Sequence, residues 1–238
     1  MAYVGDRLSD SPERRARAAR ILDVAADLLL RHGYRRVTIE DVASGADIGK
    51  GTVYLHWRTR EELFSAVFER EVREAIRALL QAVRQDPQGF LPHRLARAYF
   101  LAIMDRPLLR GFVLGDAELL GKLARSDRAR EDRHQLTSHR YFELLAEHRL
   151  LHPDLSPEAA AYAFLATFEG FLRAEAGAGE SAPADLQRRA DLLAVTVQRA
   201  FETRRKLPTA TRALLRQRGI DLLQGLIDAD QPDPDSAA

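Results

Sequence analysis

Capping residues and prolines divide this chain into segments of helical periodicity. Ser11-Pro12, Asp86-Pro87 and Ser156-Pro157 each pair a helix-capping residue with a proline suited to the first helical turn. Thr38 and Thr59 are each followed three residues later by an acidic residue, the pattern of a capping box. Between these signals, apolar residues recur at spacings of three and four. The sequence predicts helices at about residues 12–32, 38–45, 49–55, 59–86, 87–105, 108–122, 127–151, 157–176, 184–205 and 208–227.

No stretch alternates apolar and polar residues for long enough to predict a strand, so we expect an all-α fold. The chain is 46% hydrophobic and 30% charged, which is typical of soluble globular proteins and argues against disorder of the whole chain. It contains no cysteine, which excludes disulfides, thiol nucleophiles and thiolate metal ligands. No apolar run approaches the roughly 18 residues of a membrane span, and the N-terminus lacks the apolar core of a secretion signal. We expect a cytoplasmic protein with no membrane partner.

Residues 38–64 carry the strongest functional signal in the sequence. Two short helices separated by a tight turn at residues 46–48 predict a helix-turn-helix, whose second helix enters the major groove of DNA. Glycines would let the backbone approach closely, while lysine and hydroxyl groups donate to bases or phosphates. The free amides at the two threonine-capped helix starts are natural anion sites. The predicted DNA-binding residues are Thr38, Gly49, Lys50, Gly51, Thr52, Tyr54, His56 and Thr59.

The distribution of charge agrees with this interpretation. The net charge of the whole chain is only +1, but the first 60 residues carry 11 Lys and Arg against 8 Asp and Glu. Arg14, Arg15, Arg17 and Arg20 crowd the first predicted helix, as a segment lying against phosphates requires. A solvated helix face without a partner is the alternative, because charged faces are common on protein surfaces.

The run from Val37-Thr38-Ile39 through Ala46-Asp47-Ile48-Gly49-Lys50-Gly51-Thr52-Val53-Tyr54-Leu55-His56-Trp57 to Glu61-Glu62-Leu63-Phe64 resembles the DNA-binding domain of the tetracycline-repressor (TetR) family. The resemblance covers about residues 13–66. It implies a homodimeric, usually repressing regulator whose C-terminal domain binds a small molecule and then releases DNA. The chain departs from the family pattern at Asp47, where many relatives have glycine, and at Gly49, which is often serine. Asp tolerates a left-handed turn and Gly tolerates an N-cap, so we expect the fold to survive both changes.

These observations predict four regions. They are a flexible N-terminal arm (1–12), a three-helix DNA-binding domain (13–58), a helical regulatory domain for ligand binding and dimerisation (59–227) and an acidic, frayed tail (228–238). The expected partners are near-palindromic operator DNA, a second copy of the chain and a small-molecule effector of unknown identity.

Other functions are disfavoured by the same residues. Residues 45–51 superficially suggest a phosphate-binding P-loop, but the spacing is one residue short and Gly51 stands where Ser or Thr belongs. Neither His134 with His139 nor His148 with His152 forms a good metal clamp, so we expect no metal and no cofactor. No hydrolase nucleophile motif occurs, and we expect no enzyme. An enzyme without a recognisable motif or a helical adaptor stays open as the alternative.

Two sets of apolar residues are candidates for dimerisation and sensing. Stripes on the helices at about 157–176 and 184–205 suggest a four-helix dimer bundle, although an intramolecular core produces the same pattern. The predicted interface residues are Phe164, Phe171, Leu186, Leu193, Val197 and Phe201. Aromatic and apolar residues of the middle helices are candidates for a largely apolar ligand pocket. These pocket candidates are Tyr99, Ile103, Met104, Phe112, Tyr141, Phe164 and Phe168.

Overall fold

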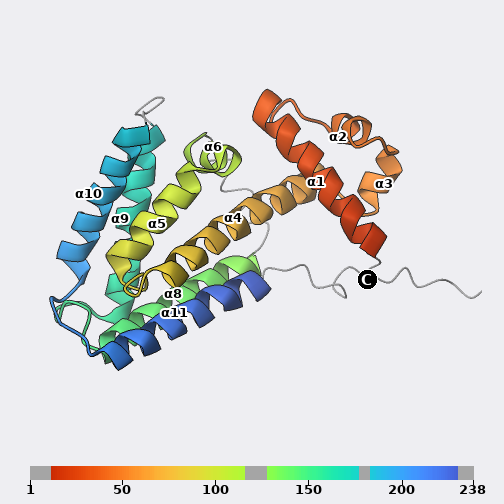
Figure 1. Cartoon of the computed structure of the whole chain (residues 1–238). Helices are drawn as coiled ribbons and strands as arrows, with labels where there is room; N and C mark the ends of the chain where they lie inside the picture. The colour runs from red at the N-terminus through yellow and green to blue at the C-terminus, as the bar shows by residue number, and fades with distance from the viewer. Residues whose placement is uncertain (1–11, 116–127, 177–182, 230–238) are drawn as a thin grey trace, which may run out of the picture. The chain divides into compact units, whose positions relative to one another are not determined.

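A computed structural model describes residues 12–115, 128–176 and 183–229, and these are helical apart from short connections (Figure 1). The helices are α1 (Pro12–His32), α2 (Ile39–Gly45), α3 (Lys50–Tyr54), α4 (Arg60–Gln85), α5 (Pro92–Met104), α6 (Pro107–Gly115), α8 (Arg128–Glu147), α9 (Pro157–Ala176), α10 (Pro183–Phe201) and α11 (Thr209–Ala229). No strand occurs within these ranges, and the only β-type pairing there is an isolated antiparallel bridge between Leu151 and Glu202. The predicted all-α fold is confirmed.

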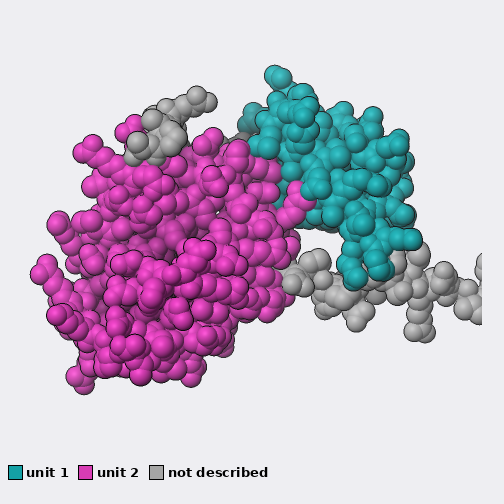
Figure 2. All heavy atoms as spheres, viewed as in Figure 1, with its two compact units in different colours: residues 1–67, 232–238 teal, residues 68–231 magenta. Residues whose placement is uncertain are grey.

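The chain divides into two compact units, coloured separately in Figure 2. Unit 1 comprises residues 1–67 with 232–238, and unit 2 comprises residues 68–231. The division falls inside α4, so one continuous helix contributes residues to both units. The predicted N-terminal arm, the predicted continuation of α6 to residue 122 and most of the predicted tail lie outside the described residues.

Unit 1 has a small core built from one face of each of its helices. The fully buried residues of α1 recur every four positions, at Ile21, Ala25 and Leu29, which is the spacing of one helical face. Gly33 ends α1 with φ +74°, a left-handed conformation that glycine adopts without steric cost. The rest of the core is formed by Val37, Ile39, Val42, Ala43, Ala46, Val53, Leu63, Phe64 and Val67.

Unit 2 is a bundle of long helices. Helix α5 packs extensively against α10, and α9 contacts α5, α6, α8 and α10. Helix α11 lies along α8 and also joins the second half of α4 in a cluster of Ile76, Leu80, Leu226 and Ile227. Figure 1 shows α4, α8 and α11 running side by side, with α9 and α10 together on the far side of α5. No helix of the described ranges is both long and apolar enough to cross a membrane.

The structure corrects the start predicted for α5. This helix begins at Pro92 rather than at Pro87. The Asp86 side chain accepts a hydrogen bond from the backbone N–H of Gln88 at 2.9 Å, and the N–H of Gly89 donates to the Asp86 carbonyl at 2.9 Å. A Cβ on Gly89 would lie 2.8 Å from the backbone of Val83, so this turn needs glycine. Asp86-Pro87 is therefore a turn that separates α4 from α5.

Two predicted helices also end earlier than expected. Helix α8 stops at Glu147 rather than residue 151, and Arg149 adopts a left-handed φ of +54°. Helix α10 stops at Phe201 rather than residue 205. Beyond these ends the two chain segments pair with each other, since the N–H of His152 donates to the Phe201 carbonyl and the N–H of Thr203 donates to the Leu150 carbonyl. These hydrogen bonds satisfy backbone N–H and C=O groups that would otherwise be bonded within a longer helix.

Candidate functional site

Helices α2 and α3 form the predicted helix-turn-helix in unit 1. The turn between them places Asp47 at φ +54°, so aspartate occupies the left-handed position that the sequence analysis assigned to it. The N–H of Ile48 donates to the Ala43 carbonyl at 3.0 Å, which closes the turn. At Gly45 a Cβ would lie 2.7 Å from Val24 of α1, so glycine allows α2 to pack closely on α1.

The outer face of α3 is open and carries little side-chain bulk. Val53 is fully buried and anchors the helix, whereas Lys50, Gly51 and Tyr54 are exposed. Gly49 is the N-cap and supplies no side-chain hydrogen bond. A Cβ at Gly49 or Gly51 would have no protein atom within 4 Å. Packing within the chain therefore does not require glycine at positions 49 and 51. The lack of side chains there leaves room for a binding partner to approach the backbone.

Lys50 is held by a carboxylate of the preceding helix. Its ammonium group forms an ion pair with Glu40 of α2 and lies 5.6 Å from the centre of the Tyr54 ring. The hydrogen bond from Lys50 lowers the pKa of Glu40, and the same bond raises the pKa of Lys50. Both side chains are largely exposed, so a stronger external anion can compete for Lys50. Glu40 is a part of the site that the sequence analysis did not identify.

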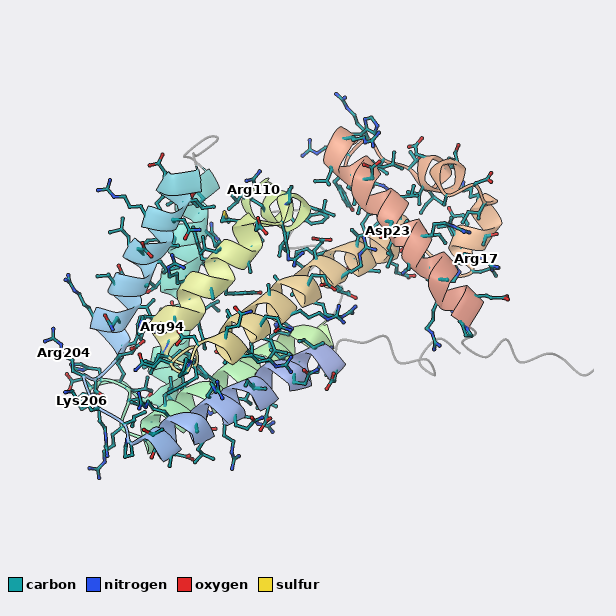
Figure 3. All side chains as sticks on the ribbon, in the orientation of Figure 1. Arg17, Asp23, Arg94, Arg110, Arg204 and Lys206 are labelled. Carbon is teal, nitrogen blue, oxygen red and sulfur yellow. The ribbon has the colours of Figure 1, made fainter. Side chains whose placement is uncertain are left out.

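His56 follows α3 and lies near the arginines of α1. Partial burial lowers the pKa of His56, and the positive charges of Arg14 and Arg17 lower it further. Its ring lies 5.4 Å from the ring of Trp57. Figure 3 labels Arg17 on α1. His56 therefore lies where the end of the helix-turn-helix meets the arginine-rich helix α1.

The two threonine-capped helix starts differ from the free anion sites that the sequence suggested. Asp41 and Thr38 form a reciprocal capping box, with Asp41 N–H donating to Thr38 Oγ1 at 3.2 Å and Thr38 N–H donating to Asp41 Oδ2 at 2.8 Å. The bond from the Thr38 hydroxyl lowers the pKa of Asp41. At the start of α4, Thr59 Oγ1 accepts from Glu62 N–H at 3.0 Å, while Glu62 Oε2 accepts from Arg58 N–H at 2.7 Å. Carboxylates of the chain itself already occupy both starts.

Arg60 joins the start of α4 to the loop before α2. Its Nε donates to the Val37 carbonyl at 2.8 Å, and its Nη2 donates to the Tyr34 carbonyl. The guanidinium centre lies 4.4 Å from the Tyr34 ring centre and 4.9 Å from that of Phe64. Sequence alone gave no signal for this role, because its partners are more than twenty residues away. Arg60 fixes the helix-turn-helix to the first turn of α4.

Unit 2 contains a cavity of about 200 Å³ between α4, α5, α8, α9 and α11. Four of the predicted pocket residues line it, namely Tyr99, Tyr141, Phe164 and Phe168. Tyr99 stacks on Phe168 with ring centres 5.5 Å apart, and Phe164 stacks on Phe168 at 6.4 Å. The remaining lining residues are Leu79, Val83, Phe90, Leu95, Ala96, His134, Thr137, Ser138, Phe142, Leu165, Gly219, Leu222, Leu223 and Leu226.

The polar groups of this cavity are few and partly committed. The Tyr141 hydroxyl donates to the Phe90 carbonyl at 2.7 Å. Burial raises the pKa of Tyr141 well above its usual value, and the charge of Glu202 raises it further. No lysine, arginine, aspartate or glutamate is among the residues that line the cavity. The cavity therefore suits an uncharged, mainly apolar molecule.

Three of the predicted pocket residues belong to the core instead. Ile103, Met104 and Phe112 are each 4% exposed and do not line the cavity. Phe112 packs edge-on against Phe68 with ring centres 5.4 Å apart. Their apolar character is explained by packing within the chain.

Burial also changes the interpretation of the predicted dimer residues. Leu193 and Val197 are fully buried and Phe201 is 3% exposed, on the side of α10 that faces the bundle. A residue buried within its own chain has little surface left for a partner. Phe164 lines the cavity and packs against Phe142 and Phe201. Of the predicted set, Phe171 and Leu186 are only half-buried.

A second apolar stripe lies on the outer faces of α9 and α10. Tyr162 and Leu165 are 78% and 51% exposed on α9, and Leu192 and Val195 are 53% and 41% exposed on α10. Each pair is separated by three positions, so both members lie on one helix face. The two helices contact each other along the bundle (Figure 1). We refer to Tyr162, Leu165, Leu192 and Val195 as the outer stripe.

Comparison with known proteins relates the N-terminal part of this chain to bacterial regulators. Residues 21–67 match the family described as bacterial regulatory proteins, tetR family. An uncharacterized HTH-type transcriptional regulator of Mycobacterium tuberculosis is 37% identical over 74 residues, which cover 31% of this chain and 37% of that protein. The match thus spans about a third of the length of this curated relative.

Solved structures extend the similarity to most of the chain. The complex of SmeT with triclosan has a TM-score of 0.60 and 21% identity, covering 81% of this chain and 99% of that one. NalD of Pseudomonas aeruginosa, named as the secondary repressor of the MexAB-OprM multidrug efflux pump, has a TM-score of 0.60 and 19% identity over 80% of this chain and all of that one. At these identities the likeness establishes a shared fold.

Proposed function

We propose that the chain is a transcriptional regulator of the tetR family, which binds an operator as a homodimer and represses transcription until a small apolar ligand releases it. The observation that carries this proposal is the outer face of α3, where Lys50, Gly51 and Tyr54 are exposed on a helix anchored by buried Val53. The repressor role is also that of NalD, which has the same fold. We assign no enzymatic activity to the chain.

DNA recognition would use the tip of α3. A recognition helix contacts base edges through its N-terminal residues, which here are Gly49, Lys50, Gly51 and Thr52. Lys50 would exchange Glu40 for a guanine acceptor or a phosphate, and Tyr54 and His56 would donate to the backbone. Thr38 and Thr59 contribute less than the sequence suggested, because their hydroxyls are committed to capping.

The DNA proposal is tested by footprinting the duplex that flanks the gene for this chain. A dimer with two-fold symmetry should protect a near-palindrome whose half-sites are centred about 10 base pairs, or a multiple of this, apart. The protein concentration needed for protection should rise with salt, since Lys and Arg contacts to phosphate release counterions. Absence of protection at low salt, both on that duplex and on genomic fragments, would contradict operator binding.

Dimerisation would bury the outer stripe of α9 and α10. Exposed aromatic and branched residues gathered on adjacent helices are unfavourable in water, and two such faces can pack as a four-helix bundle. Leu192→Glu should therefore give a monomer in light scattering at micromolar concentration. Leu214→Glu on α11 is the matched control, because Leu214 is 50% exposed and lies outside the stripe. If both variants or neither dissociate, the outer stripe is not the interface.

The ligand would occupy the apolar cavity of unit 2. A volume of about 200 Å³ with aromatic walls and no charged lining residue suits a neutral molecule of one or two small rings or a short alkyl chain. The SmeT structure holds triclosan, an apolar aromatic compound, within the same fold. A carboxylate buried in this cavity would meet no lysine or arginine among the lining residues, and only His134 could offer it a positive charge, so its burial is costly.

Release from DNA would depend on α4, which contributes residues to both units. Arg60 at its first turn binds the carbonyls of Tyr34 and Val37, and Leu79 and Val83 near its other end line the cavity. A ligand can shift DNA affinity only if it binds one conformation of the chain better than another. A change in the position of the α4 side chains is the simplest route between the two sites.

The ligand proposal is tested with triclosan and with a charged comparison, octanoate. Triclosan should bind unit 2 and weaken operator binding, whereas octanoate should do neither. Ser138→Leu narrows the cavity and should abolish the triclosan effect while operator affinity in the absence of ligand is retained. Equal responses to both compounds, or an unchanged triclosan effect in Ser138→Leu, would contradict the assignment of the cavity.

A further inference from the structure

A second, larger hollow of about 930 Å³ lies in unit 2 near the connection between α10 and α11. It differs in chemistry from the apolar cavity. We call it the basic hollow, and its lining residues are Gln88, Phe90, Leu91, Leu150, Val195, Gln198, Arg199, Glu202, Thr203, Arg204, Arg205, Lys206, Leu207 and Arg212. Figure 3 labels Arg204 and Lys206 at this connection.

Positive charge dominates the basic hollow. Four arginines and one lysine line it, against a single carboxylate, that of Glu202. Glu202 cannot neutralise them, because it is 7% exposed and already accepts from the backbone N–H of His93 at 2.7 Å and lies 2.8 Å from the His93 ring nitrogen. The hollow therefore presents several cations around one engaged anion, an arrangement that attracts a multiply charged anion.

The arginines of the basic hollow differ from others in unit 2. Arg94 pairs with Asp86, Arg97 with Asp191 and Arg189 with Glu175. Within the described part of the chain, the side chains of Arg199, Arg204, Arg205 and Lys206 form no hydrogen bond or ion pair. Arg212 donates only to the Thr209 hydroxyl. These three arginines of unit 2 face carboxylates, whereas the cations of the hollow do not.

The form of the hollow indicates the kind of anion. Leu91 and Leu207 are half-buried and supply an apolar wall beside the cations, over the buried Phe90 and Leu150. Arginine forks match phosphate oxygens in bidentate geometry, and an apolar wall accepts a planar organic body. The volume is in the range of sites for small molecules and cofactors, which are about 300–1,000 Å³.

We propose that the basic hollow is a second ligand site of the regulatory unit, which binds an organic polyphosphate of the nucleoside diphosphate and triphosphate class. The phosphates lie against Arg204, Arg205 and Lys206, with Arg199 and Arg212 beside them, and the base lies on the half-buried Leu91 and Leu207. Phe90 lines both this hollow and the apolar cavity, but none of the five cations lines the apolar cavity, so a test that removes these charges is independent of the proposed function.

The test is calorimetric titration of the full-length protein, free of DNA and divalent metal, at about 0.15 M salt. The probes are adenosine 5′-triphosphate, inorganic tripolyphosphate and adenosine. The triphosphate should bind once per chain, tripolyphosphate more weakly, and adenosine weakest of all. The variant R204Q/R205Q/K206Q should weaken triphosphate binding about tenfold or more, since charge-assisted bonds to phosphate are lost.

The control is R77Q/R84Q/R218Q, which removes the same charge from unit 2 at residues that do not line the hollow. It should retain binding. Because Val195 belongs both to the hollow and to the outer stripe, light scattering must show the same oligomeric state for both variants. Equal losses in the two variants, or no binding of triphosphate at millimolar concentration, would overturn the proposal.

The acidic residues of the C-terminal segment are the competing occupant. D230N/D233N/D235N neutralises them in the full-length chain. Triphosphate affinity should change less than about twofold in this variant. A gain of tenfold or more would show that the chain's own carboxylates fill the hollow, and the proposal of a polyphosphate ligand would be wrong.

Discussion

The helix-turn-helix of unit 1 and the cavity of unit 2 use aromatic side chains in opposite ways. In unit 1, Tyr54 is 42% exposed on a five-residue helix beside the ammonium group of Lys50. In unit 2, Phe142 and Phe168 line the cavity from helices of 20 residues each and are 1% and 5% exposed. The first arrangement presents polar groups to an external partner, and the second surrounds an internal space with apolar walls.

The difference also concerns what stabilises each region. Unit 1 supplements its small apolar core with directional polar contacts, such as the Thr38–Asp41 capping box and the Arg60 bonds to backbone carbonyls. Unit 2 relies on burial along several long helices. A substitution at an exposed aromatic residue of unit 1 should therefore affect binding, whereas one at a buried aromatic residue of unit 2 should affect folding.

The largest effect is expected for Phe100→Ala. Removing a fully buried phenylalanine from α5 should lower the free energy of unfolding by about 3–5 kcal/mol, through lost apolar burial and the space left behind. Tyr54→Ala is the contrasting variant and should leave unfolding nearly unchanged. Urea denaturation followed by circular dichroism measures both. A similar loss in the free energy of unfolding in both variants would contradict the contrast between the exposed tyrosine of unit 1 and the buried phenylalanine of unit 2.

Arg60→Ala should have the next largest effect. Arg60 donates to two backbone carbonyls and lies over two aromatic rings, so its loss should destabilise unit 1 by about 1–3 kcal/mol. Arg58→Ala is the control, because Arg58 is exposed and only its backbone N–H is bonded. Hydrogen exchange of α2 and α3 amides reports the effect. Protection equal to the wild type in Arg60→Ala would show that the directional contacts are not essential.

A smaller effect is expected for Glu40→Gln. Glu40 competes with DNA for Lys50, so its neutralisation should increase operator affinity about two- to fivefold. Asp27→Asn is the control, because Asp27 is exposed on α1 and pairs with Arg31 instead of Lys50. Fluorescence anisotropy with the footprinted operator measures both affinities. An unchanged or lower affinity in Glu40→Gln would mean that the ion pair positions Lys50 for binding.

The smallest effect concerns pH and His56. Its pKa in the folded chain is lowered by burial and by Arg14 and Arg17, so the unfolded chain takes up the proton first. The contribution of His56 to stability is therefore present above its ordinary pKa of about 6.5 and falls as pH drops through that value toward the lowered pKa. His56→Gln should reduce the difference in unfolding midpoint between about pH 7.5 and about pH 5. The same difference in both proteins would contradict the pKa shift.

Local signals made unit 1 predictable from its sequence. The capping threonines, the helical spacing of Ile39, Val42 and Ala43, and the left-handed turn at Asp47 depend on residues a few positions apart. The start of α5 was predicted wrongly because Asp86-Pro87 also suits a turn, and only the close packing of Gly89 on Val83 distinguishes the two.

Contacts between distant residues limited the prediction of unit 2. The inner and outer faces of α10 are both apolar, so sequence could not tell Leu193, which is buried, from Leu192, which is exposed. Likewise Tyr99 lines the cavity while Ile103, one turn further along α5, does not. The ion pair of Glu40 with Lys50 spans ten residues and depends on the angle between α2 and α3. Such features become visible only when the helices are packed against one another.

The most direct test of the central claim compares operator and unrelated duplex for Lys50→Ala/Tyr54→Ala. Both residues are exposed on α3, so the variant should fold normally by circular dichroism. We predict that its preference for the operator over the unrelated duplex largely disappears. A preference equal to that of the wild type would contradict recognition of DNA by α3.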